Sequence, residues 1–280
     1  MEAMNIYIKP NRMAIKCPDK ENFENIIYSH MMFVSKVCNF KCCFCKFRNG
    51  YIDDSVDKEY TTKSQNLNLE QMRKKIKELF ALGHLFKFSG CEPLLNPYIE
   101  DYLKFVKEEH GIVFLDSNCS LTQKIKSLIN KKLIDILGAS LKATDKETAA
   151  KVTGNKIKSM SWDNVLESID FAIKSNSVNR VIITYVVYNY LEKNELEHAL
   201  IKFFDLFDYY RINEHLYSKI YFKVNNLSRE VGNSALSSID NALLEQTLKK
   251  ISEEHVYLKN KIILIQSNEG AIDYSKIIFL

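Results

Sequence analysis

The amino-acid sequence predicts an α/β fold built on a mainly parallel sheet. Short apolar segments alternate with segments of helical periodicity along most of the 280 residues. No repeat, low-complexity tract or Pro/Gly-rich linker interrupts this alternation, and polar clusters directly follow several of the expected strands. Because repeated strand–helix units form parallel sheets with right-handed crossovers, we expect these polar clusters to meet at one edge of the sheet.

The first strand and helix flank a loop rich in cysteine. Residues 31–35 (MMFVS) form a short apolar run, which predicts the first strand. The cysteine loop follows, and residues 49–67 are polar without a regular pattern. Asn68, with Gln71 three residues on, resembles a capping box, so a helix is expected to begin there. The buried face of that helix would carry Leu69, Met72, Ile76, Leu79 and Phe80.

The next two units follow the same alternation. Gly83 is expected to end the first helix, and residues 84–89 (HLFKFS) predict the second strand. Asn96 followed by proline predicts the N-cap and first turn of another helix. Residues 112–115 predict the third strand, and a helix is expected near residues 121–130.

The rest of the chain continues this pattern. A fourth strand lies within residues 133–141, and residues 180–188 (RVIITYVVY) are strongly β-branched and aromatic, which predicts a fifth. The other expected elements are helices at 146–152, from Ser161 onward, at 196–207 and at 243–254, a sixth strand at 219–224 and one more strand within 257–266.

Length, composition and charge limit the classes of function. The 280 residues, 46% of them hydrophobic, are enough for one sizeable core, so we expect a single domain over residues 1–280. Its core would span about 28–228, with an extension at each end. Lys and Arg number 39 and Asp and Glu 35, and they are interspersed, so a nucleic-acid partner is not favoured.

The sequence also suggests where the protein works. Its first residues show no apolar signal region. The longest strongly apolar stretch, about residues 181–188, is far shorter than the ~20 residues that span a bilayer. We therefore expect a soluble, cytoplasmic protein. Four of its seven cysteines fall within residues 38–45, which indicates metal binding rather than disulfides.

Three of these cysteines, Cys38, Cys42 and Cys45, have the spacing C-x3-C-x2-C. Iron–sulfur clusters are held by cysteine thiolates, and three ligands leave one iron of a [4Fe–4S] cluster open. The alternatives are buried thiols or a structural zinc site, which needs four ligands and is usually built from paired knuckles. No second C-x2-C exists, so only Cys17, Cys91, Cys119 or scattered histidines could complete such a zinc site. Cys43 is interpreted as a thiol that faces the core and is not a ligand.

This spacing resembles that of the radical S-adenosylmethionine (SAM) superfamily, and Phe44 fills the aromatic position before its last cysteine. The resemblance implies a partial (β/α)6 TIM-like barrel with mainly parallel strands. It implies that the open iron binds the amino and carboxylate groups of SAM and that Phe44 packs near the adenine. An electron from the reduced cluster would then cleave SAM to methionine and a 5′-deoxyadenosyl radical.

A second motif, Ser89-Gly90-Cys91-Glu92-Pro93, resembles the GGEP motif of that superfamily. The resemblance implies that Gly90 and Glu92 lie at the SAM amino group, where acceptor groups suit a buried ammonium. Cys91 stands where glycine is usual, and a positive φ there would strain a cysteine. The alternative is a plain strand-to-helix turn.

Later segments resemble the activases of glycyl radical enzymes. Residues 116–119 (DSNC) resemble their D-T-N-G, residues 140–142 (SLK) their D-L-K, and residues 185–187 their Y-V-V. Residues 144–154 match the next activase segment, so the resemblance runs from about residue 31 to 190. It implies that Asn118, Ser140 and Lys142 lie near the carboxylate and ribose of SAM. A solvated surface lysine is the alternative for Lys142.

The target of the radical is left open. One hypothesis is hydrogen abstraction from a glycine Cα of a partner glycyl radical enzyme, and the other is modification of a peptide, a small metabolite or an RNA base. The third is a non-enzymatic zinc-binding or electron-transfer module. Cys119 is either a small buried residue or a catalytic hydrogen donor that faces the radical. An anaerobic enzyme of this kind would take electrons from a flavodoxin- or ferredoxin-type protein.

Overall fold

Seven parallel strands form the wall of the fold in the computed structural model. The structure describes residues 4–15, 27–45, 65–154, 160–189, 193–226, 238–268 and 271–279. The parallel strands are β2 (Ile27–Ser35), β4 (Leu85–Gly90), β5 (Ile112–Ser117), β6 (Ile136–Leu141), β7 (Arg180–Val187), β8 (Ile220–Asn226) and β9 (Ile262–Asn268). These seven strands lie side by side in the order in which they occur in the chain.

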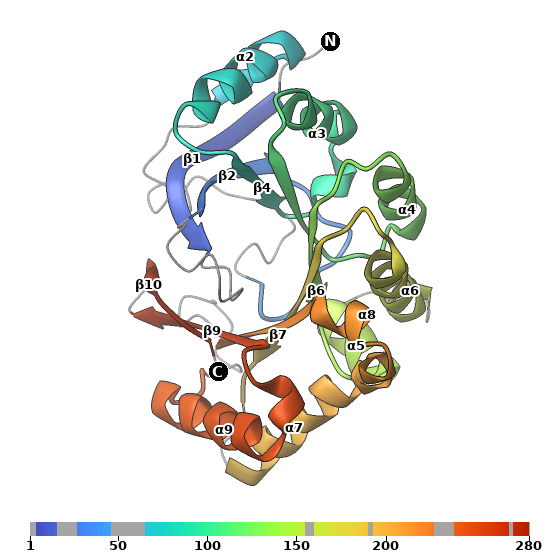
Figure 1. The fold of residues 1–280 in the computed structure, drawn as a ribbon, viewed down its shortest axis with the longest axis vertical. Helices are drawn as coiled ribbons and strands as arrows, with labels where there is room; N and C mark the ends of the chain where they lie inside the picture. Colours follow the sequence, from blue (N-terminus) through green and yellow to red (C-terminus); the bar gives the residue numbers. More distant parts are fainter. Residues whose placement is uncertain are drawn as a thin grey trace.

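Antiparallel strands extend both edges of this wall. At one edge β1 (Met4–Ile15) pairs with β2, and β3 (Gln65–Leu67) pairs with β1. At the other edge β10 (Ala271–Phe279) pairs with β9. The order is β10-β9-β8-β7-β6-β5-β4-β2-β1-β3, and no pairing joins β10 to β3 in the described part of the chain. The sheet therefore curves into a barrel that stays open (Figure 1).

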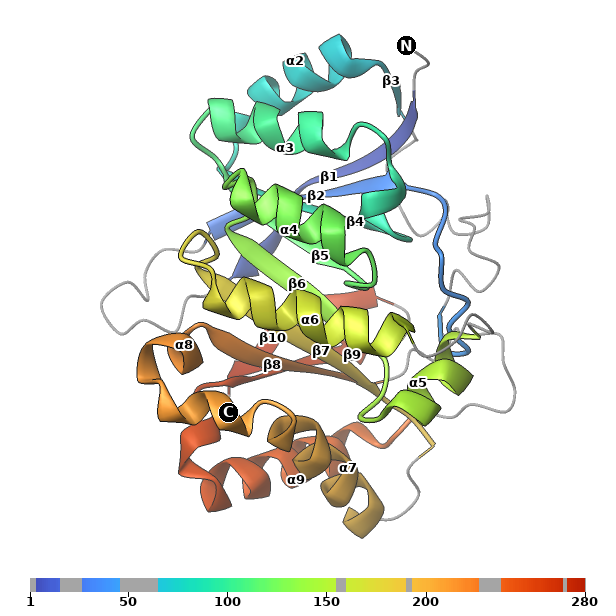
Figure 2. The ribbon, with the colours of Figure 1, turned by 90° about the vertical axis from the view of Figure 1, so that its right-hand side faces the viewer.

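Helices cover the convex face of the curved sheet (Figure 1 and Figure 2). They are α2 (Leu69–Phe80), α3 (Ile99–Glu108), α4 (Thr122–Asn130), α5 (Lys146–Thr153), α6 (Met160–Lys174), α7 (Lys193–Asp205), α8 (Glu214–Ser218) and α9 (Asn241–Glu254). Short 3-10 turns are η1 (Pro93–Leu95), η2 (Asp208–Ile212) and η3 (Val256–Leu258). Among the described residues, none of the helices is both long enough and apolar enough to cross a membrane.

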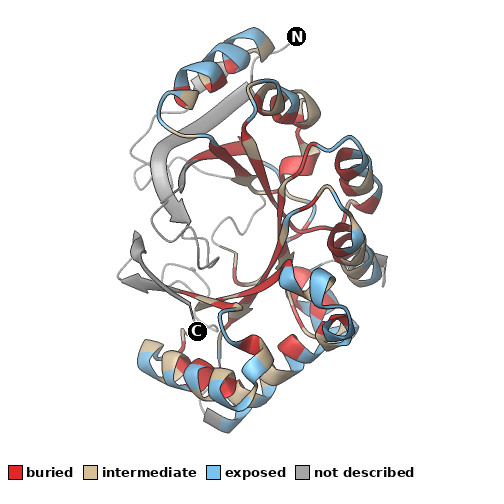
Figure 3. Ribbon diagram, viewed as in Figure 1, coloured by how far each residue is buried: buried red, intermediate tan, exposed pale blue. Residues whose placement is uncertain are grey.

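The two faces of the sheet are packed differently. Between sheet and helices lies the main core, in which side chains such as Phe86, Phe88 and Phe222 are fully buried (Figure 3). Alternate residues point to the concave face. There a smaller apolar cluster is formed by Met31, Phe33, Leu85, Phe114, Ile136, Ile182 and Tyr221, and its members on β4 to β8 lie in the first halves of their strands. Polar residues lie at the carboxyl ends of β4, β5 and β6.

The predicted fold class is confirmed, and each predicted strand is present. The capping box is also confirmed, because the side chain of Asn68 accepts from the amide of Gln71 at 2.9 Å and the reverse bond is formed. The start predicted at Asn96 is wrong, since α3 begins at Ile99. The side-chain amide of Asn96 donates instead to the carbonyl of Val34, at 2.6 Å, and ties η1 to β2. Most of residues 49–67 lie outside the described residues.

Candidate functional site

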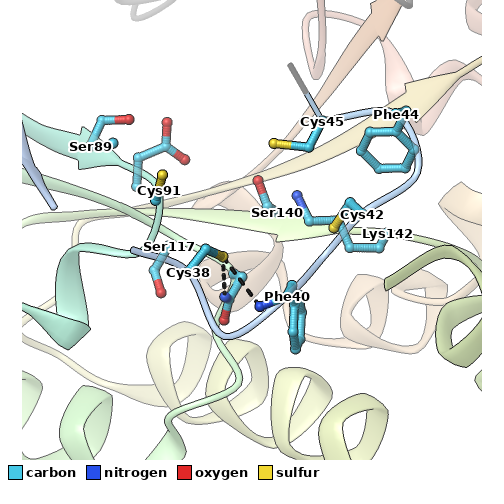
Figure 4. A pocket seen from close by; sticks show the side chains of 13 residues that line it. Cys38, Phe40, Cys42, Phe44, Cys45, Ser89, Cys91, Ser117, Ser140 and Lys142 are labelled. Carbon is cyan, nitrogen blue, oxygen red and sulfur yellow. Dashed lines mark hydrogen bonds between the residues drawn. The ribbon is translucent and has the colours of Figure 1, made fainter. Parts of the chain in front are cut away.

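A cavity of about 190 Å³ lies at the carboxyl ends of the parallel strands, where the polar clusters were expected to meet. Its walls come from the cysteine loop after β2 and from the ends of β4, β5 and β6 (Figure 4). It is lined by Cys38, Phe40, Cys42, Phe44, Cys45, Ser89, Gly90, Cys91, Asp116, Ser117, Asn118, Ser140 and Lys142. The structure thus brings together all predicted site residues except Glu92 and Cys119.

The cysteine loop is held in place by the end of α5. The amide of Lys41 donates to the carbonyl of Thr153 at 2.8 Å, and the amide of Cys43 donates to that of Val152 at 2.9 Å. Gly154 adopts a φ of +61°, and a Cβ there would lie 3.2 Å from the carbonyl oxygen of Lys41. The apolar side chains that seal this contact are Phe40, Cys42, Phe44 and Val152. Helix α5 therefore shapes the loop that carries the three cysteines.

Three of the loop thiols face the cavity. Cys42 is buried, while Cys38 and Cys45 are partly exposed. Burial raises the pKa of Cys38 and raises that of Cys42 to about 11, so metal binding must displace a proton from each. Cys43 does not line the cavity and packs beside the apolar residues of the loop. That Cys43 binds no metal therefore stays a prediction.

The arrangement of the thiols fits a cluster better than a single zinc ion. Four ligands at about 2.3 Å from one zinc ion would lie within roughly 4 Å of one another. In the described part of the chain, no three cysteine, histidine or acidic side chains are close enough together to hold one metal ion. In a cubane each thiolate binds a different iron, so separated thiols around one cavity suit it. The donor set therefore fits an iron–sulfur cluster.

Asn118 ties the end of β5 to the cysteine loop. Its side-chain NH2 group lies 3.7 Å from the thiol sulfur of Cys38 and donates to the side-chain oxygen of Asn39 at 2.8 Å. Its own side-chain oxygen accepts from the amide of Ser120 at 3.0 Å and from the hydroxyl of Ser120 at 2.7 Å. A donor next to a ligating sulfur stabilises the thiolate and orients it.

Gly90 ends β4 at the point of closest approach to β2. Its φ is +121°, and a Cβ there would lie 2.8 Å from the carbonyl oxygen of Ser35. That carbonyl accepts from the amide of Cys91 at 3.2 Å. Cys91 itself is not among the described residues with positive φ, so the strain expected for a cysteine at this position is absent. The conformational need for glycine falls on Gly90 alone.

Replacing Gly90 with alanine should therefore lower the free energy of unfolding by about 1–3 kcal/mol, because a side chain is forced into positive φ and against backbone. Chemical denaturation measures this loss. Cys91→Ala, one residue further on, is the matched control and should change stability much less. Equal losses in the two variants would contradict the assignment of the constraint to Gly90.

Glu92 lies behind the cavity and not in its wall. Its side chain is fully buried, and it accepts hydrogen bonds from the amide of Leu94 at 3.1 Å, the hydroxyl of Ser117 at 2.8 Å and the amide of Asn118 at 2.8 Å. The carboxylate therefore joins the loop after β4 to the loop after β5. Burial raises its pKa to about 7, although these hydrogen bonds oppose the shift.

The raised pKa of Glu92 makes stability depend on pH. The folded protein binds the proton more tightly than the unfolded chain, whose glutamate pKa is about 4.3. Stability is therefore full below about pH 4, and about 3 kcal/mol is lost as the pH rises through 7. Glu92→Gln has no carboxyl to titrate. As the pH rises from about 4 to 7, the unfolding free energy of this variant should therefore increase relative to that of wild type. Parallel curves from denaturation at several pH values would contradict it.

Phe44, Ser140 and Lys142 form the wall opposite the loop after β4 (Figure 4). Phe44 is buried, and its ring centroid lies 5.5 Å from that of Tyr188. The ammonium of Lys142 lies 5.7 Å from the centroid of the Phe44 ring. Lys142 is half-buried in the cavity wall.

Cys119 faces the core under the helices. It is fully buried, its φ is +60°, and it does not line the cavity. Its amide donates to the hydroxyl of Ser117 at 3.0 Å, and its carbonyl accepts from the hydroxyl of Ser168 at 2.8 Å. These contacts are those of a small buried residue, and Cys119 contributes nothing to the cavity wall.

Five cavity residues are not among the predicted site residues: Phe40, Ser89, Cys91, Asp116 and Ser117. The carboxylate of Asp116 lies 2.8 Å from the ammonium of Lys87. A signal for this pair existed, since each is an ionic residue within an apolar strand. Charges at such positions point to the barrel interior, where they need a partner.

The fold and the site together define a class of protein. An open α/β barrel carries three thiols at the end of its first parallel strand, and three further loops complete a cavity beside them. Residues that touch a ligand lie at this end of such barrels. The thiols fit an iron–sulfur cluster, so the chain has the architecture of an α/β-barrel enzyme with an iron–sulfur cofactor.

Comparisons with known proteins agree. Residues 32–202 match the radical SAM superfamily. The fold is similar to SuiB of Streptococcus suis bound to S-adenosylmethionine, with a TM-score of 0.59 and 17% identity over 84% of this chain and 49% of SuiB. It is also similar to TYW1 with a lysine–pyruvate adduct bound, with a TM-score of 0.52 and 16% identity over 86% of this chain and 76% of TYW1.

A curated relative shows the same relationship by sequence. GTP 3′,8-cyclase of Chlorobaculum tepidum is 24% identical over 151 residues, which cover 52% of this chain and 43% of the cyclase. The chain belongs to the radical SAM superfamily, whose enzymes use a [4Fe–4S] cluster and SAM. It spans less than half the length of the cyclase and of SuiB.

Proposed function

We propose that Cys38, Cys42 and Cys45 hold the [4Fe–4S] cluster and that SAM binds in the adjoining cavity. The observation that carries this proposal is the convergence of four loops on one cavity beside three thiols. When bound and reduced, the cluster and SAM supply a 5′-deoxyadenosyl radical that removes a hydrogen atom from a substrate. Electrons would come from a reduced flavodoxin- or ferredoxin-type protein.

The cavity residues divide the recognition of SAM between them. Phe44 offers an apolar ring for the adenine. Asn118, Ser140 and Lys142 offer hydrogen-bond donors and a positive charge for the carboxylate and the ribose. Gly90 lines the cavity, and the polar groups of its backbone suit the amino group.

Glu92 serves this site by position. All three of its hydrogen bonds go to the loops after β4 and β5, so it fixes Gly90 and Asn118 relative to each other. Glu92 is buried behind the cavity wall, so its carboxylate does not face SAM. The backbone of its loop is better placed than the carboxylate to contact SAM.

The substrate we favour is a small molecule or a peptide that enters the open barrel. The cavity lies at the mouth of an interior whose far end is closed by apolar side chains, so a substrate can be held close to SAM and away from water. SuiB has been solved with the precursor peptide SuiA, and the curated relative is a GTP cyclase, so related barrels take targets of these kinds.

Activation of a glycyl radical enzyme is the second candidate. It is favoured by the activase-like segments at residues 116–119, 140–142 and 185–187. The named relatives do not support it, because none of them is an activase of this kind. Ser140 and Cys119 also replace the aspartate and glycine of the activase motifs.

Cleavage of SAM tests the proposed function. Anaerobically reconstituted protein, reduced with dithionite, should convert SAM to 5′-deoxyadenosine and methionine, which chromatography measures. Omitting the reductant is the control and should abolish the product. A protein that carries its cluster yet releases no 5′-deoxyadenosine with several reductants would overturn the proposal.

A further inference from the structure

The barrel interior carries ammonium groups next to the cavity. Lys87 lies on β4, Lys142 follows β6 and Lys223 lies on β8. Phe222 and Val224, on either side of Lys223, are buried in the core beneath the helices. Because successive side chains of a strand point to opposite faces, Lys223 points into the concave interior. The same alternation turns Lys87 inward.

Lys223 stands level with the cavity. In the sheet register Ser140 of β6 pairs with Thr184 of β7, and Thr184 pairs with Lys223 of β8. Neighbouring strands are about 4.8 Å apart, so the backbone of Lys223 lies about 10 Å along the wall from that of Ser140. Ser140 lines the cavity. A group held by Lys223 would therefore lie beside bound SAM, within the barrel.

On the seven parallel strands the basic residues outnumber the acidic ones. Asp116 is the single acidic residue of the seven parallel strands β2 and β4–β9. It pairs with Lys87, their charged atoms being 2.8 Å apart. In the described part of the chain, Lys223 has neither a hydrogen bond nor an ion pair within 4 Å. Burial and the charge of Lys87 lower its pKa to about 8, so it is still mostly charged at neutral pH.

The negative groups of the cofactors would lie elsewhere in the cavity. The thiolates of the cluster belong to the loop after β2, five strands along the sheet from β8, and the carboxylate of SAM is assigned to Asn118, Ser140 and Lys142. Lys223 is half-buried, so its ammonium is partly withdrawn from water with no acidic side chain among the described residues paired to it, and this placement needs a reason. An anionic group that arrives with the substrate would provide one, since Lys binds carboxylate and phosphate as a point charge.

We propose that Lys223, next to the Lys87–Asp116 pair, is a subsite for an anionic group of the substrate, a carboxylate or a phosphate. This inference rests on the proposed function, because it places that group beside SAM in the barrel interior. The substrate class is thereby a small anionic molecule or an acidic group of a peptide. Lys87 is already neutralised by Asp116, so Lys223 makes the direct contact.

Binding of simple anions tests the subsite. Reconstituted holoprotein with SAM is titrated with inorganic phosphate and, separately, with oxalate, by anaerobic calorimetry. At least one anion should bind to wild type, and Lys223→Met should weaken it by about tenfold or more. Lys223→Arg keeps the charge and should keep most of the affinity. Lys249→Met, which removes an exposed lysine of α9, is the matched control and should leave the affinity unchanged.

The outcomes separate this inference from the proposed function. Preference for phosphate or for oxalate assigns the chemistry of the group. Equal affinity in wild type and Lys223→Met, or no binding of either anion to wild type, overturns the subsite. If Lys223→Met does not load its cluster, Lys223→Gln replaces it in the same comparison. The wild-type holoprotein is assayed in parallel for SAM cleavage, and failure there overturns the proposed function instead.

Discussion

Alanine at Cys38, Cys42 or Cys45 is expected to abolish binding of the cluster and, with it, cleavage of SAM. The three thiols line one cavity, and each would bind a different iron, so the loss of one leaves two irons without a protein ligand instead of one. Loss of residues that only support a ligand costs about 10–100-fold in metal affinity or activity, and loss of a ligand itself should cost more. Iron and sulfide content and visible absorption after anaerobic reconstitution measure the effect.

Two neighbouring cysteines provide the matched controls for this experiment. Cys43 lies in the same loop but outside the cavity wall, so Cys43→Ala should retain the iron content of wild type. Cys91 lines the cavity from the loop after β4, and burial raises its pKa to about 12. Cys91→Ala should also retain the cluster, because its thiol is not one of the three predicted ligands. Loss of iron in Cys91→Ala, with iron kept in Cys45→Ala, would contradict the ligand assignment.

The local sequence predicted the wall of this site well because parallel strands follow a simple rule. Each strand of an α/β barrel ends at the same edge, so residues directly after strands converge even when they are far apart in the chain. Asn118 and Lys142 follow expected strands, and the resemblance to the activases implied the same site for these two and for Ser140. The structure brings all three to one cavity. The cysteine spacing needed no knowledge of the fold.

The roles of Glu92 and Cys119 could not be predicted in the same way. Both residues belong to motifs at the site, but which way each side chain points depends on the backbone of its turn. Cys119 adopts a φ of +60°, which turns its side chain into the core. Glu92 is directed away from the cavity wall by amides of its own loop and of the next. Such contacts arise only once the strands have come together.

The edge strands were missed for a different reason. Residues 4–15 mix apolar residues with lysine, asparagine and proline, and their pairing with β2 is antiparallel. An antiparallel strand added to a parallel sheet needs no strand–helix unit, so the alternation that predicted the rest carries no information about it. The interior charges were also missed, because Lys87 and Asp116 are separated by a helix in sequence and become neighbours only across β4 and β5.

Replacing Asp116 with asparagine is expected to lower the free energy of unfolding by about 3–5 kcal/mol, because it leaves the ammonium of Lys87 buried without a partner. The side chain of Lys87 is 6% exposed, and its ammonium lies 2.8 Å from the carboxylate of Asp116. Lys87 and Lys223 also repel each other, and the carboxylate offsets this repulsion. Asp208→Asn is the matched control. It removes an exposed pair with Arg211, for which the expected change is about 0–1 kcal/mol.

The pH dependence identifies the charge as the cause. Burial opposes ionisation of Asp116, yet the ammonium groups of Lys87, Lys223 and Lys142 outweigh it and lower the pKa below its ordinary value. A carboxyl whose pKa is lower in the folded state stabilises the protein above the unfolded pKa of about 4, and this stability is lost as the pH falls through the folded pKa. The difference in unfolding free energy between wild type and Asp116→Asn should therefore be largest at pH 7 and should decrease as the pH is lowered.

A double variant separates the lost pair from a general loss of packing. In Lys87→Met with Asp116→Asn the ammonium that Asp116 pairs with is removed together with the carboxylate, so the double variant should be more stable than Asp116→Asn alone. Additive losses would show that the two charges do not act as a pair. If the two charges are coupled, the positive charge of Lys87 is balanced by Asp116 of the same chain. Lys223 then has no carboxylate paired to it among the described residues.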